Sequence, residues 1–585
     1  MARLWRYVMR YRLRYLGGVA CLLGATSLQM AVPWLLKQCI DAVARDAAPR
    51  ALLGYLGLIV VIALAQGVVR TFSRFIIFNA GRDIEYDLRN DLFRHLETLP
   101  LAFYQQRHTG DLMSRLVNDV TAVRMLLGPG LLNFINTPVA YLYGLAIMLS
   151  FDVRLTLAAL AVYPVAFLVV KRTSRLLMER ALRVQEGLGE LSSRVQENLS
   201  GIHVVKSYAG EEHEIQTFAR LNQRFQELNL RLARVRGFVF PVMGIVSSTG
   251  SLVVLVYGGQ EVMAGRLSVG DLAMFIAYLY QLAWPTMALG WMLSILQRGR
   301  AAMQRLNELL AVEPAIASPP GATAPERVAG EVALRGVSFR YPGGGDGAPV
   351  LDDVDLNVPA GRTIAIVGRT GSGKSSLVQL LPRLFDVGAG AVLLDGRDIR
   401  TLPLDWLRRQ VGLVPQDPFL FSRSIRENVA LALDGDGDGD GDGDGRVEWA
   451  VGMAALARDL EGFPQGLDTV VGERGVTLSG GQKQRVALAR ALAAAPRVLV
   501  LDDALASVDA ETERTILDQL RGFFRERTTI LVAHRLTTVK EADLICVLDE
   551  GRIVELGDHE SLLARGGVYA DLFRQQALEV ELEAI

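Results

Sequence analysis

The stretch Gly368-Arg369-Thr370-Gly371-Ser372-Gly373-Lys374-Ser375 decides the fold of the second half of this chain. It matches the pattern G-x-x-x-x-G-K-[ST], follows the apolar run 363–367, and leads into a helical pattern that begins at Ser376. A strand, a glycine-rich loop and a helix in this order surround phosphate oxygens with backbone N–H groups and with the positive end of the helix. We therefore expect a nucleotide-phosphate site here, with Lys374 on the β- and γ-phosphates and Ser375 on Mg²⁺.

The first half of the chain has a different composition. Hydrophobic residues make up 50% of the 585 residues and are concentrated in the first 300. A bilayer core of about 30 Å requires roughly 20 apolar residues in a helix. Six segments approach that length: 15–36, 52–78, 131–151, 155–170, 237–257 and 272–296.

After about Glu326, short β-branched runs alternate with helical stretches, which is typical of an α/β domain. The predicted fold is therefore an α-helical six-span transmembrane domain with cytoplasmic helix extensions, followed by an α/β P-loop domain. We place the transmembrane domain at 15–310, a linker at 311–330, the nucleotide-binding domain at 331–575 and a C-terminal tail at 576–585.

Lysine and arginine are unevenly distributed among the loops. The N-terminus and the stretches 79–130 and 171–236 are rich in both, whereas the short loops hold few. Positive charge marks the cytoplasmic side, so we expect both termini and both long loops in the cytoplasm and the chain in the inner (plasma) membrane. Residues 1–14 interleave arginines with apolar residues, which predicts an interfacial amphipathic helix on anionic lipid. A cluster of charges that only sets topology is the alternative.

The two long loops show helical periodicity over 82–99 and 177–199, with charge on one side. We expect membrane helices to continue into the cytoplasm there. Each loop contains a break, near Gly110-Asp111-Leu112 and near Gly201-Ile202-His203. We expect these ends to dock on a soluble partner domain, with solvated loops as the alternative.

Net charge and cysteine content give no support for a nucleic-acid-binding, disulfide-rich or zinc-binding protein. The net charge of −1 gives no support for nucleic-acid binding. Cys21, Cys39 and Cys546 are widely spaced, and they fit neither a disulfide framework nor a zinc cluster.

Two further motifs specify the nucleotide-binding domain. Asp502 ends the apolar run 498–501 and is the expected second partner of Mg²⁺. Leu478-Ser479-Gly480-Gly481-Gln482, between the P-loop and Asp502, resembles the signature of the ATP-binding cassette (ABC) family. Six spans before one cassette resemble the half-size ABC exporters, which include bacterial multidrug exporters and lipid flippases. This resemblance covers nearly the whole chain and implies ATP and Mg²⁺ as cofactors.

The resemblance also implies roles for single residues. Tyr341 in Phe339-Arg340-Tyr341-Pro342 resembles the aromatic residue that stacks on adenine, and Gln416 in Val414-Pro415-Gln416-Asp417 resembles the glutamine that senses Mg²⁺ and the membrane domain. Asp509 resembles the aspartate that crosses the dimer interface, and His534 the switch histidine on the γ-phosphate. Gly472-Glu473-Arg474-Gly475 resembles the exporter loop that touches the inner membrane loops. In the family, Ser479, Gly480, Gly481 and Gln482 would contact ATP held by the opposing subunit.

The chain departs from the family pattern at two positions. Asp503 stands where the family carries the glutamate that polarises the attacking water, and Ala506-Ser507-Val508-Asp509 replaces Ser-Ala-Leu-Asp. Aspartate is one methylene shorter, so its carboxylate lies back by roughly 1.5 Å. The longer distance between this carboxylate and the attacking water is expected to slow general-base catalysis.

This mixture resembles one subunit of the heterodimeric bacterial exporters, in which one ATP site is degenerate. We therefore expect a second, different half-transporter chain with an intact glutamate as partner. Three alternatives stay open: Asp503 acts through a shifted water, the chain forms a homodimer with slow hydrolysis, or it is an ATP-binding membrane regulator without a transported substrate.

An Asp-Gly repeat occupies 434–445. A calcium-binding EF-hand loop requires a glutamate eleven residues after its first aspartate, and Glu448 does not satisfy that register. The repeat is predicted to be a flexible surface insertion between two subdomains.

Polar, aromatic and thioether side chains in the third and sixth segments suit a hydrophobic or amphipathic drug or lipid. Helix packing and membrane-interface anchoring are alternative roles for the same residue types. The candidates are Asn133, Asn136, Tyr141, Tyr278, Gln281, Trp284, Met287 and Trp291.

Overall fold

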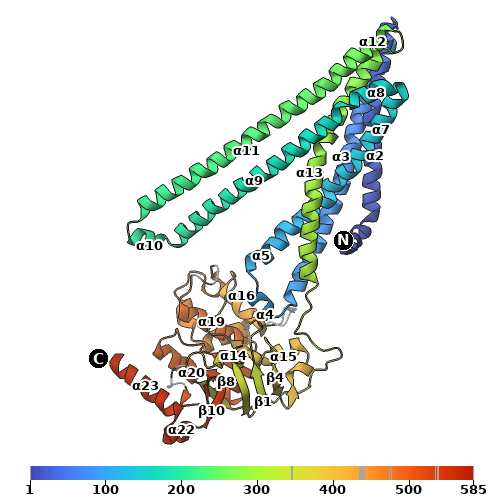
Figure 1. Cartoon of the computed structure of the whole chain (residues 1–585). Coiled ribbons are helices and arrows are strands. Elements are labelled where there is room, and N and C mark those ends of the chain that lie inside the picture. Colours follow the sequence, from blue (N-terminus) through green and yellow to red (C-terminus); the bar gives the residue numbers. More distant parts are fainter. Residues whose placement is uncertain are drawn as a thin grey trace. The chain divides into compact units, whose positions relative to one another are not determined.

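The computed structural model describes residues 2–343, 347–433, 442–472, 475, 477–533, 535 and 539–583. They form two compact units (Figure 1), one made of Met1–Leu96 and Gly110–Val312 and the other of Glu97–Thr109 and Glu313–Ile585. The first unit is helical and the second is α/β. The predicted fold class is confirmed.

The helical unit consists of long helices that are interrupted in places by π-helical turns, labelled η1 to η3. Its elements are α1 (Ala2–Arg10), α2 (Arg12–Ala44), α3 (Pro49–Glu97), α5 (Thr109–Ser114), η1 (Arg115–Asp119), α6 (Val120–Met125), η2 (Leu126–Gly130), α7 (Leu131–Phe151), α8 (Val153–Leu160), α9 (Val162–Ser200), α10 (Ile202–Ser207), α11 (Glu211–Val253), η3 (Val254–Gly258), α12 (Gly259–Met263) and α13 (Val269–Leu310).

The six predicted membrane segments all lie on these helices. Among the described residues, four helical stretches are long and apolar enough to cross a bilayer: Arg12–Ala44, Pro49–Glu97, Thr109–Phe151 and Val269–Leu310. The fifth predicted segment lies at the end of α11 and in η3. The fourth, 155–170, is divided between α8 and α9 at Ala161, so it is not the single helix that the sequence predicts.

The turn between α7 and α8 explains the close spacing of the third and fourth segments. Asp152 has extended backbone angles and its Oδ1 accepts a hydrogen bond from the backbone N–H of Leu155 at 2.7 Å. This N-cap starts α8 immediately after α7 ends. A single non-helical residue, Asp152, therefore separates α7 from α8.

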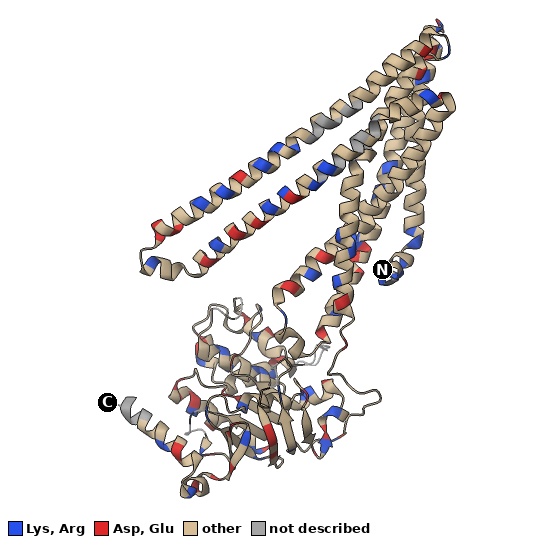
Figure 2. Cartoon of the chain, in the orientation of Figure 1, with Lys and Arg blue, Asp and Glu red and all other residues tan. Residues whose placement is uncertain are grey.

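Helices α9 and α11 form a long hairpin joined by α10 (Figure 1). Their halves near α10 carry alternating acidic and basic residues (Figure 2), and Arg194 of α9 pairs with Glu214 of α11 at 2.6 Å. Apolar periodicity on one side and charge on the other stabilise such a helix outside a membrane. The predicted helix extension over 177–199 is confirmed.

The N-terminal segment packs along the charged part of α3. Tyr7 donates a hydrogen bond to Asp91 at 2.6 Å, Arg10 pairs with Asp87 at 3.0 Å, and Arg14 pairs with Asp83. The exposed apolar residues Trp5 and Met9 lie on the opposite face of α1. The predicted interfacial helix therefore has both an acidic partner helix and an apolar face, and lipid contact by that face stays a prediction.

The α/β unit contains two sheets. The larger has the order β10-β9-β3-β8-β7-β6 and is parallel except for β10, and the smaller has the order β2-β1-β4-β5 and is antiparallel. The strands are β1 (Val332–Phe339), β2 (Leu351–Val358), β3 (Thr363–Val367), β4 (Ala389–Leu394), β5 (Arg397–Asp398), β6 (Val411–Val414), β7 (Val498–Asp502), β8 (Thr528–Val532), β9 (Leu544–Asp549) and β10 (Arg552–Gly557).

Helices cover these sheets and form a second apolar core around α17 and α19. They are α14 (Lys374–Leu380), α15 (Leu404–Gln410), α16 (Ile425–Ala430), α17 (Asp442–Met453), α18 (Ala457–Leu460), α19 (Gly480–Ala493), α20 (Ala510–Arg525), α22 (His559–Arg565) and α23 (Val568–Glu583).

Two predicted boundaries differ from the structure. Residues 434–441 of the Asp-Gly repeat lie outside the described residues, but 442–445 form the first turn of α17, where Asp444 pairs with Arg426 at 2.9 Å. The predicted tail, 576–585, is largely the end of α23. The stretch 442–445 contains only aspartate and glycine, so no apolar periodicity predicts its helix.

The short helix α4 (Leu101–Gln105) belongs to the α/β unit although it follows the membrane helix α3. Ala102 packs against the core that contains Phe339, and Gln106 Nε2 donates a hydrogen bond to the carbonyl oxygen of Pro342 at 3.1 Å. The first long loop therefore docks on the nucleotide-binding domain, but through 101–106 rather than at the predicted break near Gly110.

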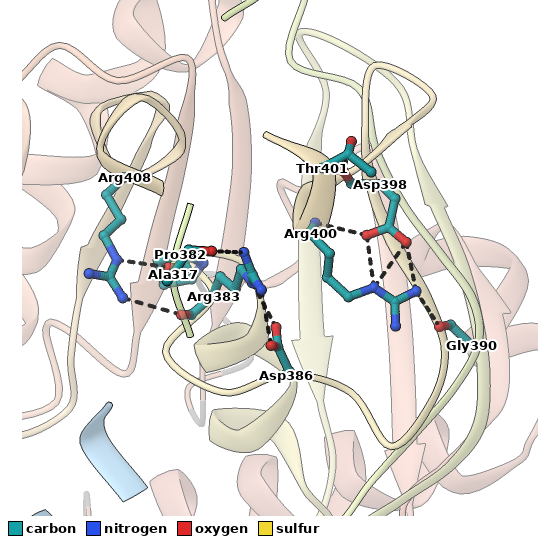
Figure 3. A network of polar contacts seen from close by, with 9 residues as sticks. All are labelled: Ala317, Pro382, Arg383, Asp386, Gly390, Asp398, Arg400, Thr401 and Arg408. Carbon is teal, nitrogen blue, oxygen red and sulfur yellow. Dashed lines mark hydrogen bonds and ion pairs between the residues drawn. The ribbon is translucent and has the colours of Figure 1, made fainter. Parts of the chain in front are cut away.

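The linker after α13 is held on the α/β unit by a network of arginines (Figure 3). Buried Arg383 donates to the carbonyl oxygen of Ala317 at 3.2 Å and forms a two-pronged ion pair with Asp386. Arg408 donates to the carbonyl oxygens of Pro382 and Arg383, both at 3.3 Å. Charge-assisted bonds of this kind fix the chain where it enters the domain.

Candidate nucleotide-binding site

The P-loop connects β3 to α14, as the sequence predicts. Gly368, Gly371 and Gly373 have φ values of +154°, +85° and +101°. A Cβ atom on Gly368 would overlap the carbonyl oxygen of Leu548, and one on Gly373 would lie 2.9 Å from the carbonyl oxygen of Val350. Glycine is therefore required at both positions by conformation and by space.

The P-loop side chains are arranged to receive an anion. Lys374 is buried, and its Nζ donates to the carbonyl oxygens of Gly368 and Arg369, both at 2.9 Å. Burial lowers the pKa of Lys374, against the opposing effect of Asp502 and Asp503. The Oγ of Ser372 is buried without a hydrogen-bond partner among the described atoms. A buried hydroxyl without a partner is costly, and a phosphate oxygen would satisfy it.

The expected Mg²⁺ residues lie together at the start of α14 and the end of β7. Ser375 Oγ donates to Asp502 Oδ1 at 3.0 Å, and Asp502 is buried. A hydroxyl and a carboxylate are hard oxygen ligands of the kind that Mg²⁺ prefers. These two residues fit the ion that the sequence predicts.

The signature motif opens α19. Ser479 is its N-cap, the backbone N–H of Gln482 donates to Ser479 Oγ at 3.3 Å, and the backbone N–H of Ser479 donates to Gln482 Oε1 at 2.9 Å. This reciprocal capping box leaves the helix N-terminus ordered and positively polarised. Arg485 and Gln482 both contact Asp459, at 2.6 and 2.9 Å, which fixes the helix from its side.

Three comparisons with known proteins agree with this geometry. The model of the ABC transporter transmembrane region matches residues 15–286, and the ABC transporter model matches 351–506. The chain is 35% identical to the protein named "Probable multidrug resistance ABC transporter ATP-binding/permease protein YheI" of Bacillus subtilis, over 99% of this chain and 98% of that protein. The chain belongs to the ABC transporter family.

Two other relatives support the exporter type. The ATP-dependent lipid A-core flippase of Syntrophus aciditrophicus is 33% identical over 99% of this chain and 94% of that protein. The structure of a bacterial Atm1-family ABC exporter with ATP bound has a TM-score of 0.79 and 29% identity, and the match covers 97% of this chain and 98% of that one. This ABC transporter is thus a multi-pass exporter with one ATP-hydrolysing domain.

Asp503 is the residue that the sequence analysis aligns with the catalytic glutamate of the family. Gln416 Nε2 lies 3.5 Å from Asp503 Oδ2, at the limit of a hydrogen bond. Asp503 has a φ of +49°, a left-handed conformation that aspartate tolerates better than most side chains. The structure therefore brings the predicted Gln416 and Asp503 together beside Asp502.

A buried glutamine that the sequence analysis missed connects three motifs of the transporter. Gln484 Oε1 accepts a hydrogen bond from the backbone N–H of Ser507 at 2.8 Å, and its Nε2 lies 3.5 Å from the carbonyl oxygen of Gln416. A Cβ on Gly481 would lie 2.9 Å from the carbonyl oxygen of Ser507. The unusual stretch Ala506-Ser507-Val508-Asp509 thus packs against the signature. The sequence feature that could have indicated Gln484 is its position two residues after Gln482, the last residue of the signature.

Among the remaining predicted site residues, the structure describes Tyr341 and Asp509. Tyr341 lies near the P-loop helix, since its hydroxyl is 2.9 Å from Ser376 Oγ and its ring packs edge-on against Phe339 and Phe385. Asp509 caps α20 by accepting from the backbone N–H of Thr512 at 2.9 Å. His534, Glu473 and Arg474 lie outside the described residues, so their roles stay predictions.

The candidate substrate residues in the membrane helices mostly have helix-packing partners. Tyr278 is fully buried and donates to the carbonyl oxygen of Met30 at 2.6 Å, and Asn136 Oδ1 accepts from Thr26 at 2.8 Å. Asn133 instead donates to the carbonyl oxygen of Pro129, four residues earlier on the same helical stretch, at 2.8 Å. Tyr141 is hydrogen-bonded to Thr286. Trp291 is exposed, and the side chains of Trp284 and Met287 lie outside the described ones.

Proposed function

We propose that this chain is one subunit of a heterodimeric ATP-driven exporter of hydrophobic or amphipathic compounds in the inner membrane, and that its own ATP site hydrolyses slowly. The observation that carries the proposal is Asp503 at the position of the catalytic glutamate, 3.5 Å from Gln416. A base must lie about 2.6–3.2 Å from the group that it deprotonates, so a retreat of roughly 1.5 Å removes most of its effect.

The need for a second subunit follows from the family, since half-size ABC transporters act as dimers. The family resemblance implies that ATP on one P-loop is completed by the signature of the opposing chain. Because the capping box of Ser479 and Gln482 is complete, this chain supplies an intact signature to the partner's site.

The geometry also supports a route from ATP binding to transport. The first loop docks on the nucleotide-binding domain through α4, and the second ends in α10, where Ile202, Val204 and Tyr208 are exposed. These apolar side chains suit docking on the partner's nucleotide-binding domain. Ser375 and Asp502 would hold Mg²⁺, which neutralises phosphate charge. Closure of two cassettes would then shift the membrane helices between inward and outward states.

Asp503 also favours a second candidate, an ATP-binding membrane regulator without a transported substrate. Transport in inverted membrane vesicles discriminates between the two functions. Vesicles with this chain and its partner should accumulate a fluorescent amphipathic dye only when ATP is present, and vesicles in which both P-loop lysines are changed to alanine should not. ATP hydrolysis without dye or lipid movement in any assay would support the regulator.

A further inference from the structure

A single polar side chain is buried on α19, the helix that the signature opens and whose residues the structure describes throughout. The other buried residues of this helix are alanine, valine or leucine, whereas Gln484 is 3% exposed. A buried amide costs free energy unless its donors and its acceptor have partners, and an apolar side chain of similar volume avoids that cost. The contacts of Gln484 therefore indicate what this amide contributes.

Gln484 binds the turn that follows β7. Its Oε1 accepts a hydrogen bond from the backbone N–H of Ser507 at 2.8 Å. Its Nε2 lies 3.5 Å from the carbonyl oxygen of Gln416, at the limit of a hydrogen bond, so the bond to Ser507 is the stronger contact. Because that bond is made to the backbone, it does not depend on the side chain at position 507, where this chain departs from the family pattern.

The same turn is fixed at several other points. The backbone N–H of Ala506 donates to the carbonyl oxygen of Asp503 at 3.2 Å, and Arg535 Nη1 donates to the carbonyl oxygen of Val508 at 3.1 Å. Asp509 then caps α20. The position of Ser507 is therefore set from the end of β7, and its N–H gives α19 a fixed point of attachment.

Two glycines of the signature lie against the same residue. A Cβ atom on Gly480 would lie 3.4 Å from the Cβ of Ser507, and one on Gly481 would lie 2.9 Å from the carbonyl oxygen of Ser507. Gly480 and Gln484 are four residues apart, so they lie on one face of α19. The helix thus contacts Ser507 at two successive turns, and the hydrogen bond of Gln484 holds the glycines in place.

We propose that Gln484 is a positioning residue for ATP hydrolysis: through Ser507 it fixes where Gly480 and Gly481 meet the nucleotide of the opposing chain. This inference rests on the proposed dimer, in which each signature serves the ATP of the other chain. A displacement of about 1 Å can lower a rate by about a hundredfold even when its cause is remote from the reacting atoms. Gln484 does not contact the nucleotide in this account, so its whole effect passes through the signature.

The test measures steady-state ATP hydrolysis by the purified complex of this chain and its partner. Gln484→Met removes both polar contacts and keeps an unbranched side chain of similar volume. We expect turnover to fall about tenfold, because the signature is no longer held against Ser507. This chain's own P-loop should bind a fluorescent ATP analogue within about twofold of the unchanged affinity, measured in a complex whose partner has alanine in place of its P-loop lysine.

The matched control is Thr528→Val, which also removes two buried hydrogen bonds. Thr528 is fully buried at the start of β8, where its hydroxyl donates to the carbonyl oxygen of Gly330 at 2.6 Å and accepts from the N–H of Gly361 at 3.1 Å. Asp502 pairs with the other end of this strand, so the change lies away from the nucleotide-binding residues. Thr528→Val should lower stability in urea unfolding but keep turnover within about twofold.

A double-mutant cycle with Ser479→Ala separates positioning from general destabilisation. If Gln484 acts through the signature, Gln484→Met should lower turnover by no more than about twofold in a complex that already carries Ser479→Ala. A residue that only stabilises the domain would lower turnover by the same factor in both backgrounds.

Unchanged turnover in Gln484→Met overturns the inference. An equal loss of turnover in Thr528→Val contradicts it, and so does an undiminished loss on top of Ser479→Ala. A parallel loss of ATP affinity at this chain's own P-loop would place the effect in the wrong site. Gln484→Asn, whose amide lies back by roughly 1.5 Å, repeats the comparison if the methionine variant folds poorly.

These outcomes are separate from those that test the heterodimer. If this chain acts as a homodimer with rapid hydrolysis, the proposed asymmetry fails, but the same variants still measure the role of Gln484 in that homodimer. If the complex is asymmetric and Gln484→Met hydrolyses ATP as fast as the unchanged protein, only the assignment of Gln484 fails.

Discussion

Asp502 and Asp503 are neighbours with different surroundings. Asp502 ends β7, is buried and accepts a hydrogen bond from Ser375. Asp503 begins the following turn with a φ of +49°, and its backbone N–H donates to the carbonyl oxygen of Val532 at 2.9 Å. The backbone thus fixes where the second carboxylate starts, and only the length of the side chain decides how far it reaches.

Replacement of Asp503 by glutamate tests this explanation. In the purified chain, Asp503→Glu should raise ATP hydrolysis about tenfold, because the carboxylate extends toward the attacking water. It should also cost about 1 kcal/mol of stability, since glutamate is less tolerant of a positive φ. Steady-state ATPase assays and thermal unfolding measure the two effects. The gain must disappear when Lys374→Ala is added, and an unchanged rate in the single variant would show that side-chain length is not limiting.

Lys374→Ala tests the P-loop itself. The variant loses the charge-assisted hydrogen bonds to phosphate, worth about 1.5–3 kcal/mol, so ATP binding to this chain should weaken by roughly ten- to a hundredfold. Equilibrium binding of a fluorescent ATP analogue measures this, with circular dichroism as the control for folding. Unchanged affinity would mean that Lys374 does not contact the nucleotide.

At the scale of elements, two helices of the α/β unit begin with a capping box whose N-cap residue is serine. Ser479 caps α19 with Gln482, and Ser424 caps α16 with Glu427. Only the first is part of the signature. A serine substitution at either helix removes an N-cap, but only the substitution in the signature also removes a group that our account places on the nucleotide. Comparison of the two variants therefore separates capping from nucleotide contact.

Ser479→Ala and Ser424→Ala should each destabilise the chain by about 1 kcal/mol, the usual cost of losing an N-cap. Only Ser479→Ala should in addition lower ATP hydrolysis at the partner's site, because that hydroxyl faces the partner's nucleotide in our account. Urea unfolding and the ATPase rate of the complex measure both effects. Equal losses of activity in the two variants would reduce Ser479 to a capping residue.

The sequence predicted where helices and loops lie better than it predicted which other parts of the chain they contact. Apolar runs located the membrane segments on α2, α3, α7 and α13, and the glycine pattern located the P-loop, since both signals are local. The fourth segment was predicted as one helix, but it is divided at Ala161. The docking point of the first loop was missed by several residues because Gln106 binds Pro342, 236 residues later in the chain. The bond between Arg70 and Gln29 was likewise not predicted, because it joins two helices at residues 41 positions apart.

At the scale of the whole molecule, the two compact units contribute different parts of the transport function. The helical unit contains the membrane segments and the α9–α11 hairpin, and the α/β unit contains the P-loop and the signature. Half-size ABC transporters act as dimers, so a complete exporter needs a second chain. Neither hydropathy nor motif spacing identifies that chain, because its contacts are made by exposed surfaces. The asymmetry between Asp503 and the intact signature is the feature that points to a different partner.

The most direct measurement compares one conservative change in each subunit of the purified complex. Changing the partner's catalytic glutamate to glutamine should nearly stop ATP turnover, whereas Asp503→Asn should lower it by no more than about twofold, because that site contributes little base catalysis. ATPase rates of the two variant complexes are measured under identical conditions. Equal and large losses in both variants, or fast transport by a homodimer of this chain alone, would contradict the asymmetric mechanism.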